Sequence, residues 1–274
     1  MRKLCLAAVT LLTTATTLAQ KHIPPVFGAD TARFREDIMT RSYLTPKKIL
    51  WASSNTSVQN PELLLKKGTG QADIFNQGMC RLVNSGNERA SLILDFGHEL
   101  HGGLKLVISS CTPLSTPQVR LRFGESVSET CAELNTTKSI AETGSKADVN
   151  LKANTATNDH AIRDMVLTIP FYGQIEVGST GYRFVRIDLL TPGQTVNLKE
   201  ATAILRYRDI PYLGSFRCSN QRLNDIWMTG AYTVHLNMQE YIWDGVKRDR
   251  LVWLGDMHPE TSTISNVFGD DGSF

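Results

Sequence analysis

The sequence predicts a mainly β protein, an antiparallel β-sandwich followed by one or two helices. Short apolar runs alternate with polar residues between about Gly78 and Tyr212, as in Val119–Phe123. This period of two is typical of strands that are buried on one face. After Pro211 the apolar residues recur at every third or fourth position, which indicates a helix. The change of period predicts a domain boundary there.

The chain of 274 residues is expected to divide into four segments. Residues 1–19 resemble a signal peptide, because Arg2 and Lys3 precede an apolar run and small residues end at Ala19. An extended lead-in over 20–46, a β-sandwich over 47–212 and the start of a helical domain over 213–274 follow. The N-terminal apolar run is too short to span a bilayer. We therefore expect a soluble, exported protein, periplasmic or secreted, with no membrane span.

Individual strands are predicted where the apolar runs occur. The sequence ILWASS within residues 47–58 predicts the first strand and places Trp51 in the core. Further strands are predicted at residues 90–96, 104–109, 119–123, 165–169, 184–189 and 201–207. A polar stretch over 128–160 has little periodicity and is interpreted as a long loop.

Charge and cysteine content restrict the function further. The formal net charge is only +2, from 29 basic and 27 acidic residues, so nucleic-acid binding is not expected. Four cysteines follow the signal segment, and an oxidising compartment permits disulfides between them. Cys111 and Cys131 flank a predicted hairpin and are the expected pair, although other connectivities stay open.

The histidines of the sequence HELH are expected to be structural. His98 and His101 do not have the H-E-x-x-H spacing of a helical zinc site. The nearby Gly97, Gly102 and Gly103 favour a turn instead of a helix that presents both rings on one face. We therefore predict no metal site here.

A long amphipathic helix is predicted after Pro211. Its apolar face consists of Leu223, Ile226, Trp227, Gly230, Ala231, Val234 and Met238. Ser219 or Asn220 is the candidate N-cap, and Trp227 is assigned to the helix core. Pro259 can open a second helix at its first turn, with Thr261–Phe268 as its beginning.

The segment Tyr241–Glu260, with the sequence YIWDGVKRDRLVWLGDMHPE, contains the densest chemistry in the chain. It places Asp244, Asp249 and Asp256 among the indole rings of Trp243 and Trp253. Carboxylates bind hydroxyl groups, a carboxylic acid can protonate a leaving oxygen, and an indole face packs on the apolar face of a sugar. Alternatively, the segment is a solvated turn in which the basic residues Lys247, Arg248 and Arg250 pair with the aspartates.

The spacing D-G-x-x-R-D-x-x-x-W-x-G-D resembles the acid-bearing motif of bacterial α-L-rhamnosidases, which are inverting glycosidases with an (α/α)6 catalytic barrel. The resemblance implies that Asp249 is the general acid and that Asp244 and Asp256 bind the sugar, with Trp243 and Trp253 beside it. The runs Asp95–Leu104, RFGES at 122–126 and Gly181–Leu190 are similar to the β-sandwich that precedes the barrel in that family. The resemblance covers roughly residues 80–270.

One departure from the family concerns the acid itself. The usual acid is a glutamate, whereas residue 249 is an aspartate, one methylene shorter. A second registration of the motif would place Arg250 at the acid position, and arginine cannot donate a proton at working pH. The first registration is preferred because it also places Trp253 and Asp256 without a gap.

The length of the helical part has its own implication. About sixty residues follow Pro211, whereas twelve helices of about a dozen residues with their loops need several times that length. The sequence therefore predicts a truncated barrel, with the general base further downstream and little activity of this chain alone. The exposed apolar helix face would then favour self-association.

Two functions stay open. The first is the N-terminal part of a secreted glycoside hydrolase that removes terminal α-L-rhamnose or a similar sugar from an oligosaccharide or plant glycan. Proton transfer of this kind requires no cofactor. The second is a non-catalytic carbohydrate-binding or scaffold module formed by the β-sandwich. Further sequence with helical hairpins and a carboxylate would distinguish them.

Overall fold

The computed structural model describes residues 39–73, 78–132, 163–247 and 249–269, all within one compact unit. The predicted signal peptide, most of the lead-in and residues 133–160 of the predicted loop lie outside these ranges. The strands are β1 (Met39–Leu44), β2 (Lys48–Ala52), β3 (Val58–Gln59), β4 (Cys80–Asn84), β5 (Ser91–Thr112), β6 (Gln118–Gly124), β7 (Asp164–Thr168), β8 (Gly173–Leu189) and β9 (Gln194–Arg208). The helices are η3 (Pro61–Leu65, a 3-10 helix), α1 (Val127–Cys131), α4 (Gln221–Asn237) and α5 (Leu254–Val267).

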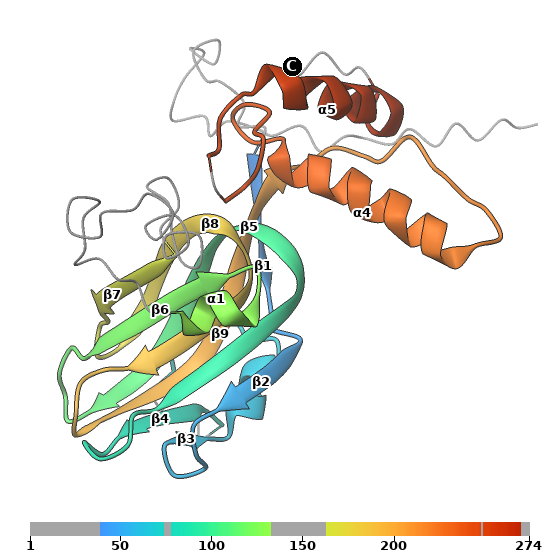
Figure 1. Cartoon of the computed structure of the whole chain (residues 1–274). Coiled ribbons are helices and arrows are strands. Elements are labelled where there is room, and N and C mark those ends of the chain that lie inside the picture. Colours follow the sequence, from blue (N-terminus) through green and yellow to red (C-terminus); the bar gives the residue numbers. More distant parts are fainter. Residues whose placement is uncertain (1–38, 74–77, 133–162, 248, 270–274) are drawn as a thin grey trace, which may run out of the picture. The chain divides into compact units, whose positions relative to one another are not determined.

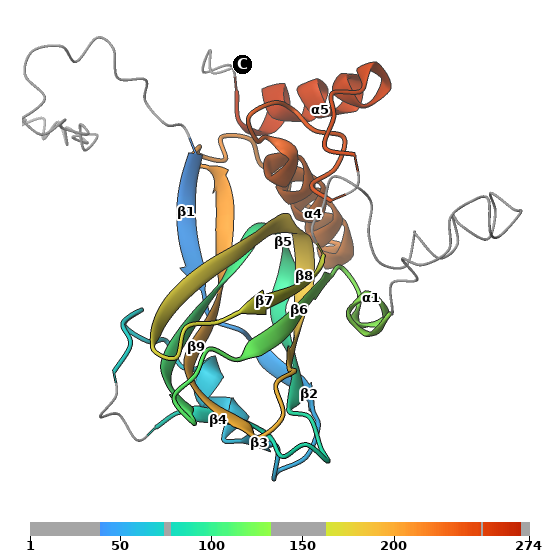
Figure 2. The same cartoon turned by 90° about the vertical axis from the view of Figure 1, so that its left-hand side faces the viewer.

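The long strands β5, β8 and β9 bend so that one antiparallel sheet forms two layers (Figures 1 and 2). The first part of β5 pairs with β2 and with the end of β8, and β6 and β7 continue this layer. The second part of β5 pairs with β9 and with the start of β8. In this second layer β1 and β4 pair with β9 on the side opposite β5, and β3 pairs with β4. The predicted β-sandwich is confirmed.

Glycines allow β5 to bend without ending. The pairing register with β8 shifts between Asp95 and Leu100 and again between Gly102 and Leu104. Gly97 and Gly102 have φ angles of 91° and 147°, which L side chains rarely adopt. A Cβ atom at Gly102 would lie 1.8 Å from the carbonyl oxygen of Ile204. The turn predicted around these glycines is therefore wrong, because bulges bend the strand and leave it continuous.

The core lies between the two layers and follows the alternation that predicted it. Inward residues include Leu92, Leu94, Leu104, Leu106, Ile108, Val119, Leu121, Phe123, Val185, Ile187, Val196 and Leu198. One polar network is also buried: the Asp188 carboxylate accepts from Arg122 at 2.8 Å, from Arg186 at 2.9 Å and from Ser91 at 2.6 Å. These bonds offset the cost of burying its charge.

Two further sequence predictions about the sandwich are wrong. Trp51 is 46% exposed on β2, with the Arg186 guanidinium 5.5 Å from its ring centroid, and is not in the core. Cys111 and Cys131 are free thiols, as are Cys80 and Cys218. Cys111 is buried in the sandwich, whereas Cys131 is exposed at the end of α1.

The short helix α1 lies at the start of the stretch predicted to be a loop. Its N-cap Ser126 accepts a hydrogen bond from the backbone N–H of Glu129, and a serine cap of this kind allows even a brief helix to begin. The loop prediction is therefore wrong for residues 128–131.

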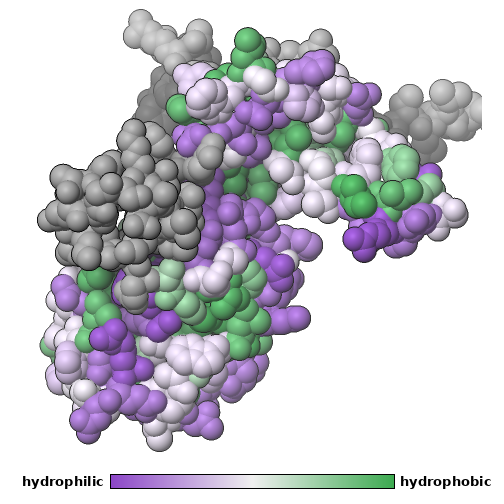
Figure 3. Space-filling model, viewed as in Figure 1, coloured by the Kyte–Doolittle hydropathy of each residue, from purple (hydrophilic) through white to green (hydrophobic). Residues whose placement is uncertain are grey.

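Helix α4 begins at its predicted N-cap, Asn220, whose side chain accepts from the Arg222 N–H. Its two halves differ in burial. Leu223 and Ile226 in the first half are 47% and 57% exposed, and Figure 3 shows hydrophobic surface on this part of the molecule. The second half packs on α5 in a small core of Ala231, Met238, Ile264, Val267 and Phe268, and Trp227 and Val234 are partly buried against it.

Helix α5 begins earlier than the sequence predicts. It starts at Leu254, where the Trp253 carbonyl accepts from the N–H groups of Asp256 and Met257 at 3.1 and 3.0 Å. Pro259 lies inside the helix and does not open it. Its missing N–H would have reached the carbonyl of Gly255, so the helix loses one bond near its start. No described helix has the length and apolar character needed to cross a membrane.

Candidate functional site

The predicted site residues lie mainly on the connection between α4 and α5. This connection closes on itself at Asp244, whose backbone N–H donates to the Leu251 carbonyl at 2.9 Å and whose Oδ1 accepts from the Leu251 N–H at 3.0 Å. We name residues 244–251 the acid loop, because they include Asp244 and Asp249. The Asp244 carboxylate thus helps to fix the loop that carries the second aspartate.

The acid loop is hydrogen-bonded to β8 of the sandwich. The Gly181 N–H donates to the Val246 carbonyl at 3.0 Å, and Arg250 donates to the Ser179 carbonyl at 3.0 Å. A Cβ atom at Gly181 would lie 2.5 Å from a methyl carbon of Val246, so the close approach requires glycine. Arg250 has a φ of 53°, an uncommon conformation for a non-glycine residue, which the surrounding contacts maintain.

Lys247 is the third contact between the loop and the sandwich. Its side chain is buried, and its Nζ lies 2.8 Å from Glu125 Oε2 and also contacts Glu129. Both acids lie where β6 leads into α1. The solvated-turn alternative expected Lys247 and Arg250 to pair with the aspartates of the motif. Lys247 pairs instead with Glu125 and Glu129, and the Arg250 side chain donates to the Ser179 carbonyl.

Trp243 packs against His101 at the edge of this contact. The two ring centroids are 5.3 Å apart with the planes at 90°, and the Arg250 guanidinium lies 5.6 Å from the indole centroid. His101 is fully buried on β5. Burial, followed by the charges of Arg206 and Arg250, lowers the pKa of His101 to about 4, so its ring is neutral near pH 7. His101 thus serves as a packing residue for Trp243, as the structural interpretation expected.

The remaining predicted residues occupy the start of α5 and the middle of the loop. Trp253 is about half exposed and precedes α5, and Asp256 is exposed in its first turn, where the helix dipole favours an acid. Asp249 is partly buried. Among the described residues, no group of three or more His, Cys, Asp or Glu side chains is placed to hold a metal ion.

Glu260 on α5 is a buried carboxyl near two of the predicted aspartates. Burial raises the pKa of Glu260, and the charges of Asp256 and Asp244 raise it further, against a hydrogen bond with Asn237. The structure therefore brings Asp244, Asp256 and Glu260 into one electrostatic neighbourhood at the junction of the two helices. A carboxyl in this position resists ionisation.

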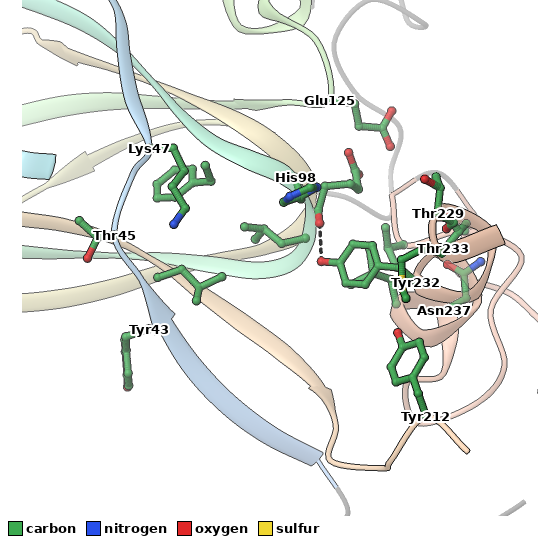
Figure 4. Close-up of a pocket in the computed structure, with 18 of the residues that line it drawn as sticks. Tyr43, Thr45, Lys47, His98, Glu125, Tyr212, Thr229, Tyr232, Thr233 and Asn237 are labelled. Atoms are coloured by element: carbon green, nitrogen blue, oxygen red, sulfur yellow. Dashed lines mark hydrogen bonds between the residues drawn. The ribbon is translucent and has the colours of Figure 1, made fainter. Parts of the chain in front are cut away.

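A cavity of about 910 Å³ lies between the sandwich and α4 (Figure 4). Its walls include the rings of Tyr43, Phe96, Tyr212 and Tyr232 and the carboxyl groups of Glu99, Glu125 and Asp244. The Tyr232 hydroxyl donates to the Glu99 carbonyl at 2.6 Å and links α4 to the bend of β5. Burial and then the nearby charge of Glu125 raise the pKa of Glu99 to about 8.

Comparison with known proteins identifies the segment that contains this site. Residues 211–274 match the model of the bacterial alpha-L-rhamnosidase 6 hairpin glycosidase domain. This match makes the C-terminal segment, and not the whole chain, similar to the domain of bacterial α-L-rhamnosidases. The matched segment contains all five residues predicted to form the site, from Trp243 to Asp256.

Two solved rhamnosidases share the fold over most of the chain. The rhamnosidase from Klebsiella oxytoca, solved with rhamnose bound, superposes with a TM-score of 0.59 at 17% identity over 85% of this chain. The GH78 family rhamnosidase of Bacillus sp. GL1 gives a TM-score of 0.51 at 18% identity over 77%. This chain spans 42% and 19% of the lengths of those two chains. No match was found among curated proteins.

Several residues that contact the acid loop or line the adjacent cavity were missed by sequence reasoning. Glu99 and Glu125 lie within the two runs HELHGG and RFGES, which were noted only as sandwich motifs. Lys247 was considered only as a partner for the aspartates of its own segment. The position of Lys247 inside the motif was the one indication in the sequence that it belongs to the site. Its partner Glu125 is about 120 residues away in the chain, so local spacing could not predict the pair.

Proposed function

We propose that this chain is the N-terminal part of a secreted glycoside hydrolase that removes terminal α-L-rhamnose or a similar sugar from an oligosaccharide or plant glycan. The main support is that the Asp244–Asp256 motif lies in the segment that matches the rhamnosidase catalytic-domain model. The fold shared with two rhamnosidases agrees with this assignment. The signal-peptide pattern of residues 1–19 supports export to the periplasm or the medium.

In this proposal Asp249 is the general acid and protonates the glycosidic oxygen as the bond to the leaving group breaks. Asp244 and Asp256 accept hydrogen bonds from sugar hydroxyls, and Trp243 and Trp253 supply apolar faces. The two ends of the acid loop, Asp244 and Leu251, are hydrogen-bonded to each other. These bonds would limit motion of the acid during proton transfer. The reaction needs no cofactor or metal.

Inverting hydrolysis also requires a base that activates water from the opposite face of the sugar, about 6.5–9.5 Å from the acid. We do not assign Glu260 to this role, because burial holds it toward the protonated form whereas a base must be ionised. We place the base in the remainder of the catalytic domain, since this chain spans less than half of the Klebsiella oxytoca rhamnosidase. Little hydrolysis is then expected from the 274-residue chain alone.

The proposal is tested with the protein extended through the complete helical domain. It should hydrolyse an aryl α-L-rhamnoside and release the β-anomer first, as followed by proton NMR of the early product. Initial release of the α-anomer would exclude the inverting mechanism, and no hydrolysis would favour a carbohydrate-binding or scaffold module.

The acid assignment has its own test. Asp249→Asn should reduce turnover of substrates with poor leaving groups far more than that of activated ones, because good leaving groups need less protonation. Asp225→Asn is the matched control, since this aspartate is exposed on α4 and bonds to Gln221. Equal losses on both substrate types would remove Asp249 from the acid role.

A further inference from the structure

The contact between the acid loop and the sandwich includes a lysine that is almost completely removed from water. Lys247 is 5% exposed, and its Nζ contacts the carboxylates of Glu125 and Glu129. An ammonium group is costly to bury unless it is paired and hydrogen-bonded. This arrangement therefore stabilises one position of the loop against the sandwich and penalises the others.

The acidic partners are held in place by the fold of their own segment. Glu129 Oε2 accepts from the backbone N–H of Glu125 at 2.8 Å, and Ser126 Oγ accepts from the N–H of Glu129 at 3.4 Å. These reciprocal bonds resemble a capping box at the start of α1. The Glu129 carboxylate is thus held in place before the lysine reaches it, so less ordering is required when the loop docks.

Lys247 also lies between the other two contacts of the loop with β8. The Val246 carbonyl, one residue before it, accepts from Gly181, and Arg250, three residues after it, donates to Ser179. Asp249 lies within the short segment bounded by these contacts. A displacement of Lys247 therefore moves the backbone that carries Asp249.

We propose that Lys247 is a positioning residue, which holds the acid loop on the β-sandwich through Glu125 and Glu129 and so fixes the place of Asp249. The part that concerns catalysis rests on the proposed function, whereas the docking itself does not. The β-sandwich then contributes to the reaction without touching the sugar. The role requires a cation that reaches both acids, and arginine is the one natural substitute that keeps its charge.

Hydrogen exchange on the 274-residue chain tests the docking. Lys247→Met, which keeps much of the length of the side chain but removes its charge, should speed exchange of the Gly181 and Leu251 amides at least tenfold relative to amides in the β4–β9 ladder. Lys247→Arg should restore much of the protection. Lys199→Met is the matched control. Lys199 lies on β9 and donates to the Gln71 carbonyl instead of contacting the acid loop, so the exchange of both amides should be unchanged.

Two outcomes would overturn the docking role. One is unchanged exchange at both amides in Lys247→Met, and the other is an equal acceleration of all amides, which would indicate only a general loss of stability. If Lys247→Met does not fold, Glu125→Gln decides the matter in the same measurement. Glu125 is 44% exposed at its side chain, so this variant removes one partner with little change in packing.

Activity of the complete enzyme tests the consequence for catalysis. Lys247→Met should lower kcat on poor leaving groups at least tenfold more than on activated ones, with KM little changed and with recovery in Lys247→Arg. Equal losses on both substrates would overturn positioning of the acid. If the wild type hydrolyses no rhamnoside but the exchange result holds, the proposed function fails and the docking role stands.

Discussion

Replacing Glu99 with glutamine should stabilise the protein at alkaline pH. Glu99 lines the cavity beside Glu125, and Lys247 forms ion pairs with Glu125 and Glu129. Burial and the charge of Glu125 raise the pKa of Glu99 from 4.5 to about 8, so Glu99 keeps its proton in the folded state near neutral pH. Glutamine resembles this neutral form and never ionises.

The sign of the effect follows from proton binding. Between pH 4.5 and 8 the unfolded chain releases the Glu99 proton while the folded protein retains it, so wild-type stability falls as pH rises through this window. One pKa unit corresponds to about 1.4 kcal/mol, which gives an upper limit of about 5 kcal/mol. Because Glu125 is partly exposed and water screens its charge, we expect about 2–3 kcal/mol in favour of Glu99→Gln at pH 9.

Urea denaturation followed by tryptophan fluorescence between pH 4 and 9 measures this difference. The free energies of unfolding of wild type and Glu99→Gln should agree at pH 4 and diverge until about pH 8. Glu62→Gln, on the exposed first turn of η3, is the matched Glu-to-Gln control. Parallel curves for Glu99→Gln over the whole range, or a less stable variant above pH 8, would refute the assignment of the proton to Glu99.

Three further variants test other parts of the fold. Gly102→Ala should cost more than about 3 kcal/mol or prevent folding, because its Cβ would meet the β9 backbone. Gly173→Ala, which has open space but a φ of 117°, should cost only the backbone strain, about 1–2 kcal/mol, in chemical denaturation. Asp188→Asn should cost about 3–5 kcal/mol, since it leaves a buried arginine without its counter-charge, and the loss should shrink as pH falls and wild-type Asp188 is protonated. Replacing exposed Leu223 and Ile226 together with glutamine should reduce self-association in size-exclusion chromatography with light scattering; an unchanged mass distribution would exclude this helix face as the contact.

Local pattern was sufficient to predict the sandwich and the first long helix. The alternation in Val119–Phe123 and the spacing from Trp227 to Met238 each reflect one buried face, and burial there follows the period of the element. The same reasoning failed at Gly97 and Gly102, because a glycine that permits a turn also permits a bulge in a continuous strand. Whether the chain turns or continues depends on partner strands far away in sequence.

The site could be predicted only as a list of residue types. Spacing identified the segment from Trp243 to Asp256, but it could not show that Lys247 lies against Glu125 and Glu129 or that Trp243 packs on His101. Such contacts join distant segments and depend on how β8 bends. Trp51 was wrongly assigned to the core because it lies in an apolar run. It is exposed because β2 lies at an edge of the sheet, where one face meets water.

The bend of β8 leaves part of this strand without a second neighbour. Residues 173–182 pair with β5 on one side, while β6 pairs only from residue 184 onward, so among the described strands the other side is an open edge. Open edges invite pairing with another chain. At this edge Ser179 and Gly181 instead bond to Arg250 and Val246, so the acid loop also shields the sandwich from edge-to-edge aggregation. A sandwich shortened before the loop would lose the apolar face of α4 but would gain a strand edge able to recruit a second molecule.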